Sequence, residues 1–344
     1  MFLFFSIVVF YTKNGIISTF HKRFWLFSQF NILLKENLCD KIAVNVHKGG
    51  EKVYNLSDFN TVKQILEKNG FHFTKALGQN FLIDGTVCPR MAEHAVSDGE
   101  TGIIEIGAGV GVLTQELAKR SERVVSIELD KRLLPILSET LSDFDNVEIV
   151  NDDVLKVDLN ELIKEKFGNR KVSVCANLPY YITSPVIMRL LESDLPIEKI
   201  VVMVQKEAAD RICAKVGDRD SGALTVAVNF YSEAQKLFFV PKGSFMPSPK
   251  VDSMVISMKK RSSPPVNPES EQIFRQVVKA AFAQRRKTAV NSISSGLGLS
   301  KQTVSDILVS NGFDINVRAE KFTMEDFCRV ADAIYQYKKT EEKI

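Results

Sequence analysis

The stretch Ile103-Ile-Glu-Ile-Gly107-Ala-Gly109-Val-Gly111 is the strongest indication of the fold of this chain. Its first four residues are a mostly β-branched run typical of a strand, and residues 112–120 continue with a helical pattern. Glycines between a strand and a helix let the backbone turn tightly and let a ligand approach the helix N-terminus. The stretch therefore predicts a strand, a ligand-binding loop and a helix in succession.

The same alternation of short β-branched runs and helical patterns extends from about residue 86 to 260. It predicts an α/β fold, with a mostly parallel, doubly wound sheet. Further strands are expected at 124–127, 147–150, 171–176 and 200–204, and a helix is expected at 131–141. Residues 237–240 and 251–258, on either side of a Pro-rich turn, are expected to form an antiparallel hairpin at the sheet edge. Before this core, Ser57-Asp58 opens a short capped helix that ends at Asn69-Gly70.

The length of 344 residues argues for roughly two domains, and 45% hydrophobic with 25% charged residues excludes a disordered or polytopic membrane protein. The clearest linker is RSSPPVNPES at 261–270, followed by helical patterns only. We therefore expect a core domain at 53–262 and a small all-α C-terminal domain at 263–344.

Residues 1–52 form an atypical N-terminal extension. They carry +4, which leaves −1 for residues 53–344 of a chain with net charge +3. Their first ten residues are an apolar run too short to span a bilayer. Because Lys48-Gly-Gly-Glu51 is what a purine-rich ribosome-binding sequence would encode, we expect translation to begin near Val53 and the extension to be a start-site artefact.

Cysteine and histidine usage indicates a reducing compartment and no metal. The five cysteines are odd in number and show no C-x-x-C spacing, and the four histidines form no cluster. We therefore expect a cytoplasmic protein without disulfides, a metal site or a membrane anchor. The residues concerned are Cys39, Cys88, Cys175, Cys213, Cys328, His21, His47, His72 and His94.

The glycine loop has the pattern G-x-G-x-G after an acidic residue, Glu105, which is typical of S-adenosylmethionine (SAM) methyltransferases. The dinucleotide fingerprint G-x-G-x-x-G would need glycine at position 112, where the chain has Val112. The loop alone leaves three interpretations open: a SAM site, which we prefer, a nucleotide-dependent oxidoreductase, and a tight turn without a ligand.

Two carboxylates lie at the ends of the next strands. Glu128 follows the glycines by about 20 residues, the spacing at which a carboxylate accepts hydrogen bonds from ribose hydroxyls. Asp152 and Asp153 follow the third strand, where an aspartate can accept from an adenine amine. We choose Asp153 for this contact, because the carboxyl edge of such a sheet is where ligands bind. Exposed surface acids are the alternative for both.

The most specific motif is Asn177-Leu178-Pro179-Tyr180, directly after the fourth strand. The exocyclic amine of adenine is a poor nucleophile, because its lone pair is delocalised into the ring. The Asn177 amide oxygen and the Leu178 carbonyl can both accept from this amine and favour a pyramidal nitrogen. Pro179 removes a backbone donor and stiffens the loop, and Tyr180 offers a ring on which an unstacked base can lie.

These motifs together resemble the small-subunit (16S) ribosomal RNA adenine dimethyltransferases, over about residues 57–335. The resemblance also includes Lys75-Ala-Leu-Gly-Gln-Asn-Phe-Leu82, Ile127-Glu-Leu-Asp130, Val204-Gln-Lys-Glu207, Phe245-Met-Pro-Ser-Pro-Lys-Val-Asp-Ser253 and Phe282-Ala-Gln-Arg-Arg-Lys287. It implies a Rossmann-like class I methyltransferase core and the transfer of two methyl groups from SAM to N6 of each of two adjacent adenosines near the 3′ end of 16S rRNA, within the small (30S) subunit.

The resemblance also assigns site residues. SAM contacts are implied for Asn80, Leu82, Gly107, Glu128, Asp153 and Asn177. The catalytic set is Asn177, Leu178, Pro179, Tyr180 and Phe245, with Phe245 as the second aromatic of a base clamp that faces Tyr180. We expect a monomer.

Residues 272–305 hold six basic residues and no acidic one, which favours phosphate contacts by the C-terminal domain. The predicted RNA-binding residues are Arg285, Arg286 and Lys287. Two alternatives remain: a 23S rRNA adenine methyltransferase of the antibiotic-resistance type, and an RNA-binding assembly factor on the same fold that has lost catalysis. The intact Asn177–Tyr180 motif argues against the second.

Overall fold

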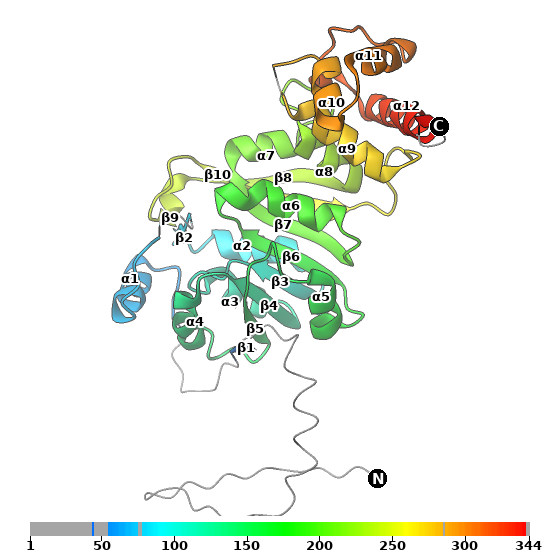
Figure 1. Cartoon of the computed structure of the whole chain (residues 1–344). Helices are drawn as coiled ribbons and strands as arrows, with labels where there is room; N and C mark the ends of the chain where they lie inside the picture. Colours follow the sequence, from blue (N-terminus) through cyan, green and yellow to red (C-terminus); the bar gives the residue numbers. More distant parts are fainter. Residues whose placement is uncertain (1–42, 45–53, 75–77, 285, 342–344) are drawn as a thin grey trace, which may run out of the picture. The chain divides into compact units, whose positions relative to one another are not determined.

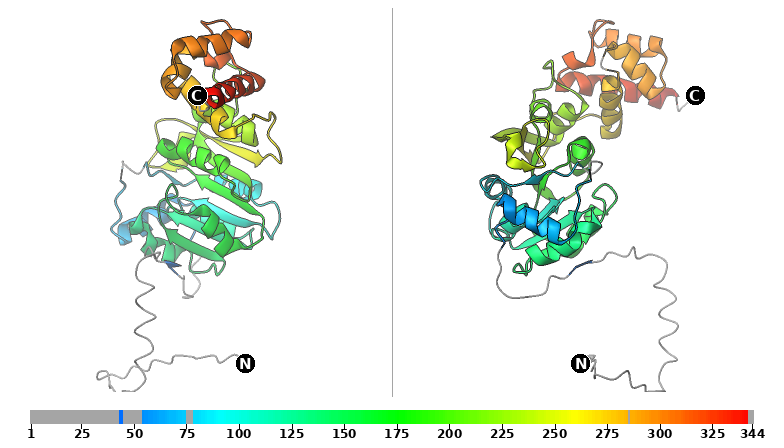
Figure 2. Two further views of the ribbon diagram at one scale, coloured as in Figure 1. Left: turned by 45° about the vertical axis from the view of Figure 1, so that its right-hand side comes forward. Right: turned by 90° about the vertical axis from the view of Figure 1, so that its left-hand side faces the viewer.

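The computed structural model describes residues 43–44, 54–74, 78–284 and 286–341. Cys39, Arg285 and nearly all of the N-terminal extension lie outside these residues. The start-site prediction for residues 1–52 therefore stays a prediction. The described residues from 43 onward belong to one compact unit, which Figures 1 and 2 show in three views.

A mixed sheet forms the centre of this unit, and it confirms the predicted fold class. Its strand order is β1-β5-β4-β3-β6-β7-β10-β8. The strands β3 to β7 run parallel, whereas β10 pairs antiparallel with both β7 and β8. The bounds are β1 Ala43–Val44, β3 Gly102–Ile106, β4 Arg123–Glu128, β5 Val147–Asn151, β6 Val172–Asn177, β7 Ile197–Gln205, β8 Ser232–Val240 and β10 Ser253–Lys260.

Helices cover both faces of the sheet, which is why the parallel strands are apolar at successive positions. Ile103 and Val124 lie in the core of one face, and their neighbours Ile104 and Val125 lie in the core of the other. The first core includes residues of α1 Phe59–Lys68, α2 Val87–Ala95, α3 Val112–Ala118 and α4 Leu134–Thr140; the second includes residues of α5 Leu159–Phe167, α6 Thr183–Glu192, α7 Lys206–Ile212 and α8 Ala223–Tyr231.

Some predicted bounds differ from the structure. The helix predicted at 131–141 is a 3₁₀ turn, η2 Lys131–Leu133, followed by α4, because Pro135 is tolerated only in the first turn of an α-helix. The edge strand β8 begins earlier than predicted, since its first residues are polar and gave no apolar signal. The short pair β2 Phe81–Leu82 and β9 Phe245–Met246 was not predicted.

The chain after the linker is helical, as predicted. Its helices are α9 Glu271–Phe282, α10 Ala289–Leu297, α11 Lys301–Ser310 and α12 Met324–Glu341. They share a core that includes Phe274, Phe322 and Phe327, and Val226 and Phe230 of α8 also belong to it. The helical region therefore packs on the end of the core domain. Nothing tests the boundary at residue 262, which stays a prediction.

Candidate functional site

A cavity of about 280 Å³ opens at the carboxyl ends of the parallel strands. It lies where the strand order reverses, because the chain moves from β3 outward to β4 and β5 and then returns to β6 beside β3. Doubly wound sheets bind ligands at such a switch point. All ten residues predicted for the cofactor and the catalytic set line this one cavity: Asn80, Leu82, Gly107, Glu128, Asp153, Asn177, Leu178, Pro179, Tyr180 and Phe245.

The glycine loop forms one wall of the cavity. Gly107, Gly109 and Gly111 have φ values of 81°, 60° and 94°, a region that favours glycine. Gly111 is the N-cap of α3, so the loop delivers the chain directly into the helix. A Cβ atom on Gly109 would lie 3.3 Å from the ring of Phe81, so the missing side chain also permits close packing by the segment that contains Asn80 and Leu82.

Glu128 ends β4 with its side chain held by the backbone. Its two carboxylate oxygens accept hydrogen bonds from the N–H of Gly109 (3.0 Å) and of Asp130 (2.8 Å). The residue is only 6% exposed, and burial raises its pKa although these N–H groups act against the rise. This geometry presents a fixed acceptor to the cavity, as recognition of a hydroxyl requires.

Asp152 and Asp153 follow β5 and both line the cavity. Asp153 accepts a hydrogen bond from the Leu155 N–H at 2.9 Å, and Asp152 accepts from the Asp153 N–H at 2.7 Å. Lys156 lies 3.7 Å from the Asp153 carboxylate. Because both aspartates reach the cavity, the choice of Asp153 stays a prediction.

The Asn177–Tyr180 loop leaves β6 at the opposite wall. The Asn177 amide nitrogen donates to the Asn80 carbonyl at 3.4 Å, which leaves the amide oxygen as its free acceptor. The Tyr180 hydroxyl lies 3.0 Å from the Ser253 hydroxyl at the start of β10, so the ring is tethered at its far end. Burial raises the pKa of Tyr180, which keeps it a neutral phenol.

Phe245 reaches the same cavity from β9, where it pairs with Leu82 of β2. Its side chain is 4% exposed. The structure thus places Tyr180 and Phe245 in one cavity although 65 positions separate them. That the two rings lie on opposite faces of a bound base stays a prediction.

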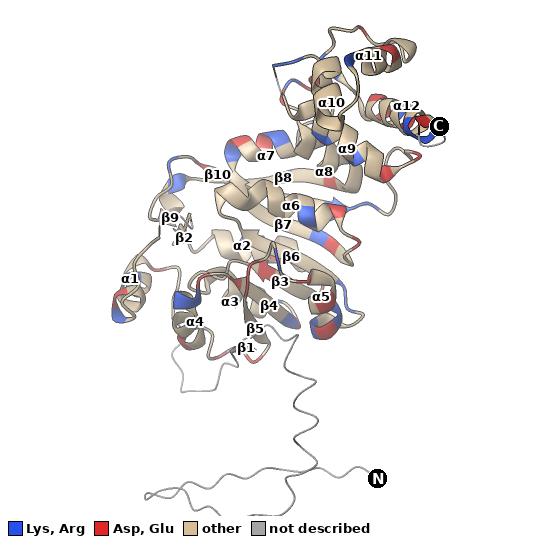
Figure 3. Cartoon of the chain, in the orientation of Figure 1, with Lys and Arg blue, Asp and Glu red and all other residues tan. Residues whose placement is uncertain are grey.

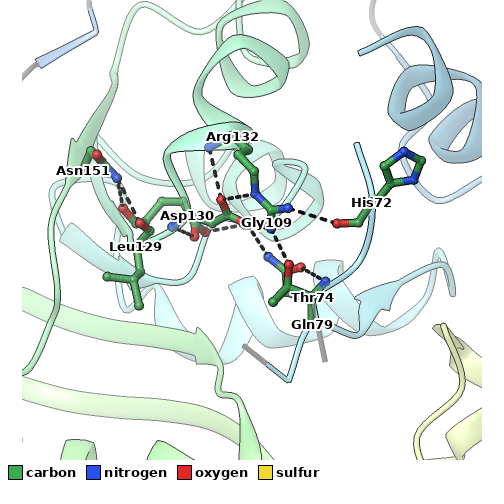
Figure 4. Close-up of polar contacts among 9 residues, drawn as sticks. His72, Thr74, Gln79, Gly109, Leu129, Asp130, Arg132 and Asn151 are labelled. Carbon is green, nitrogen blue, oxygen red and sulfur yellow. Dashed lines mark hydrogen bonds and ion pairs between the residues drawn. The ribbon is translucent and has the colours of Figure 1, made fainter. Parts of the chain in front are cut away.

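Sequence reasoning missed a set of polar residues beside the glycine loop, which Figure 4 shows in close-up. Asp130 accepts from the Gln79 amide nitrogen at 2.7 Å and from Arg132 at 2.5 and 2.8 Å, and Arg132 holds the pKa of Asp130 below its usual range. Arg132 also donates to the His72 carbonyl and the Thr74 hydroxyl. The sequence offered two signals, the proximity of Asp130 to Glu128 and the position of Gln79 within the Lys75–Leu82 motif.

Two of the predicted RNA-binding residues, Arg286 and Lys287, do not line this cavity. Arg286 and Lys287 are exposed in the turn between α9 and α10, and Arg285 lies outside the described residues. Figure 3 shows lysine and arginine along α9, near this turn and at the start of α11. The basic character of the stretch is therefore on the surface of the helical region.

None of the helices in the described part of the chain is both long enough and apolar enough to cross a membrane. Within those same residues, no three or more His, Cys, Asp or Glu side chains gather where they could hold a metal ion.

Comparison with known proteins connects this geometry to a family. Residues 70–336 match the family described as ribosomal RNA adenine dimethylase. A protein of Geobacillus sp. (strain WCH70), named ribosomal RNA small subunit methyltransferase A, is 48% identical over 276 residues, which cover 79% of this chain and 95% of the relative. A Bacillus pumilus (strain SAFR-032) protein of the same name is 46% identical over 79% of this chain and 94% of its own length.

Solved structures agree with this assignment. The crystal structure of the 23S rRNA methyltransferase ErmE superposes with a TM-score of 0.56 at 26% identity, covering 75% of this chain and all of that one. A dimethyladenosine transferase from Plasmodium falciparum, at 23% identity and a TM-score of 0.57, covers 74% of this chain and 96% of its own and shows the same fold. The chain, with its glycine loop and Asn177–Tyr180 motif at one cavity, belongs to the ribosomal RNA adenine dimethylase family.

Proposed function

We propose that this protein transfers methyl groups from SAM to N6 of two adjacent adenosines near the 3′ end of 16S rRNA, within the small ribosomal subunit. The observation that carries the proposal is that one cavity joins the glycine loop and Glu128 to the Asn177–Tyr180 loop. A cofactor wall and an amine-recognising wall therefore face a common space. This activity places the protein in the cytoplasm, where the ribosome is.

The residues present fit SAM. Glu128 is a buried carboxylate whose remaining lone pairs can accept from ribose hydroxyls. Asp153 can accept from the adenine amine of the cofactor, and Gly107 lets the backbone approach closely. Asn80 and Leu82 complete this side of the cavity. When bound, SAM would supply an electrophilic methyl group.

The target adenine is recognised by acceptors rather than by a base of tuned pKa. The Asn177 amide oxygen and the Leu178 carbonyl accept from the N6 amine, which concentrates its lone pair on nitrogen. The Tyr180 ring, held through Ser253, and the Phe245 ring bind the faces of the base. The methylated amine is acidic and loses its proton to water, so no general base is needed.

The relatives favour the small subunit over the large one. Identity to proteins named ribosomal RNA small subunit methyltransferase A is 46–50% over nearly their whole length, against 26% to the 23S rRNA methyltransferase. The direct test is incubation of the protein with labelled SAM and 30S subunits that lack the modification, followed by mapping of the labelled nucleotides. Label in two adjacent adenosines near the 3′ end of 16S rRNA is expected. Label in 23S rRNA, or none, would refute the proposal.

We further propose that the helical region binds RNA through the turn between α9 and α10. Arg286→Ala with Lys287→Ala is expected to weaken binding to 30S subunits and to flatten its salt dependence by about two units of slope, because two phosphate contacts are lost. Affinity for SAM should not change, since neither side chain lines the cavity. Filter binding between 50 and 200 mM salt measures the affinity for 30S subunits and the slope of its salt dependence.

A matched control for this prediction is Lys63→Ala with Lys164→Ala. These lysines are also exposed, on α1 and α5, and the substitution removes the same charge. A salt slope that falls equally in the two double variants would show that net charge alone matters and would contradict a specific RNA-binding turn.

A further inference from the structure

The residues on either side of positions 75–77 both contact one ion pair, Asp130–Arg132, beside the cavity. We use the term arm for residues 71–74 and 78–83. Within it, Asn80 and Leu82 line the cavity, while Gln79 points to the end of β4 and contacts Asp130. The arm therefore forms part of the cavity wall without belonging to the central sheet.

Arg132 holds the arm to the sheet through several hydrogen bonds from one guanidinium group (Figure 4). Two of its nitrogens donate to the buried Asp130 carboxylate at 2.8 and 2.5 Å. The same group donates to the His72 carbonyl at 3.2 Å and to the Thr74 hydroxyl at 2.8 Å. Its Cζ atom also lies 4.9 Å from the centre of the Phe71 ring.

Asp130 also contacts the second part of the arm, residues 78–83, through Gln79. Its Oδ2 accepts from the Gln79 amide nitrogen at 2.7 Å, while the Gln79 amide oxygen accepts from the Thr74 N–H at 3.2 Å. The two parts of the arm, 71–74 and 78–83, are thus joined to each other and to the sheet at one carboxylate. Because Asp130 is only 7% exposed, its contacts are less screened than those of a surface pair.

The remaining arm contacts include the pairing of Phe81 and Leu82 with β9, the hydrogen bonds of Ile83 to Ser244 and of Asn177 to Asn80, and a set of apolar contacts. Phe81 packs against Gly109 of the glycine loop and against the Phe73 ring, 5.3 Å away between centroids. Gly78 lies against the Tyr181 ring, where an added Cβ would be 3.4 Å from the ring. These contacts hold residues 78–83 at the cavity, whereas residues 71–74 are joined to the sheet by the directional contacts at Asp130 and Arg132.

We propose that the Asp130–Arg132 pair is a positioning device, which docks the arm so that Asn80 and Leu82 complete the cofactor wall. This inference rests on the proposed function for its link to SAM, but the docking itself does not. Arg132 does not line the cavity, so it acts on the cofactor through the arm and through its partner Asp130, which does line it. If only a fraction of molecules has a docked arm, the apparent Kd for SAM rises as the inverse of that fraction.

The test compares Arg132→Ala, Arg132→Lys and Arg170→Ala in the full chain. Arg170 makes contacts of 2.5 and 2.8 Å to Glu122 and is as exposed as Arg132, at 44%, but neither residue of this pair lines the cavity. Lysine keeps the charge but lacks the planar fork that reaches several acceptors at once. It should therefore fail to restore docking fully.

Hydrogen exchange measured without cofactor reports directly on the docking of the arm. The informative amides are those of Thr74 and Ile83, whose N–H groups donate to the Gln79 amide oxygen and to the Ser244 carbonyl. Arg132→Ala should speed exchange at both about tenfold and leave β3 and β4 unchanged, and it should raise the Kd for SAM by the factor by which the docked fraction falls. Arg170→Ala should do neither. At one SAM concentration the cofactor should slow arm exchange by a smaller factor in Arg132→Ala than in the wild type, because the variant binds SAM more weakly.

The outcomes separate this inference from the proposed function. Unchanged exchange at Thr74 and Ile83 in Arg132→Ala, or a rise that extends through β3 and β4, would overturn the positioning role, as would an equal effect of Arg170→Ala. Faster arm exchange with an unchanged Kd for SAM would also overturn it. Failure of the wild-type protein to bind SAM would refute the proposed function, while the exchange measurement would still decide whether Arg132 docks the arm.

Discussion

Replacement of Asn177 with alanine is expected to lower kcat for methyl transfer by about 100- to 1,000-fold, the usual effect of removing one preorganised polar group from a reacting centre. The change removes the amide oxygen that accepts from the adenine N6 amine. Because Asn177 is one of six predicted SAM contacts and the other five are unchanged, the Kd for SAM should change far less than kcat. Single-turnover transfer to 30S subunits and equilibrium binding of SAM measure the two quantities.

The matched variant for this prediction is Asn177→Asp. It keeps an acceptor of nearly the same size but loses the amide nitrogen that donates to the Asn80 carbonyl. We therefore expect it to retain more activity than the alanine variant. A wild-type kcat in Asn177→Ala at saturating SAM and 30S subunits would exclude the proposed role of Asn177.

The second large effect concerns Glu105, which precedes the glycine loop in β3. Its side chain is fully buried, and burial raises its pKa from 4.5 to about 7, although the Thr114 hydroxyl donates to it at 2.6 Å. Its other oxygen has no hydrogen-bond partner among the described residues. A raised acid pKa means that the folded state holds the proton more tightly than the unfolded state.

The sign of the pH effect follows from this shift. Below pH 4.5 the Glu105 carboxyl is protonated in both states, and above pH 7 it is ionised in both. Between these values the free energy of unfolding should fall by about 3 kcal/mol as pH rises, since the charge becomes costly only in the folded state. Glu105→Gln, which is neutral throughout, should abolish this dependence and be the more stable protein at pH 8.

Urea denaturation of both proteins between pH 5 and 8.5 checks this result. The difference between the two unfolding free energies cancels the titration of all other groups. Glu161→Gln serves as the control, because Glu161 is exposed at the start of α5. A difference that stays constant with pH would show that Glu105 does not titrate in this range.

Local sequence patterns predicted the central strands and most of the site because their causes are local. The alternating apolar strands are buried on both faces, and an apolar run of this kind is visible without a structure. The capped helix α1 follows the same logic: the Asp58 side chain accepts from the Thr61 N–H, as its position before the apolar pattern indicated. Glu128 and Asn177 were predictable because the ends of parallel strands meet at one edge.

Elements that depend on contacts between residues distant in sequence were not predicted. The strand pair β2–β9 joins Phe81 to Met246 across more than 160 positions, and two residues give no periodic signal. The start of β8 is polar because an edge strand is partly exposed, so no apolar run marked it. Tyr180 and Ser253 form their hydrogen bond only because β10 lies beside β7 and brings the two hydroxyls to 3.0 Å.

Local patterns in the chain are enough to predict the fold class, the glycine loop and the chemistry of the Asn177–Tyr180 loop, because each depends on residues that are neighbours in sequence. The network of Arg132, Asp130 and Gln79, and the cavity that Leu82 and Phe245 share with Glu128, exist only once the chain has folded. Such contacts join segments distant in sequence, and hydrogen bonds and apolar packing leave no periodic pattern across that distance. The physical reason is that backbone preferences act over a few residues, whereas a cavity is built where the sheet brings separate loops together.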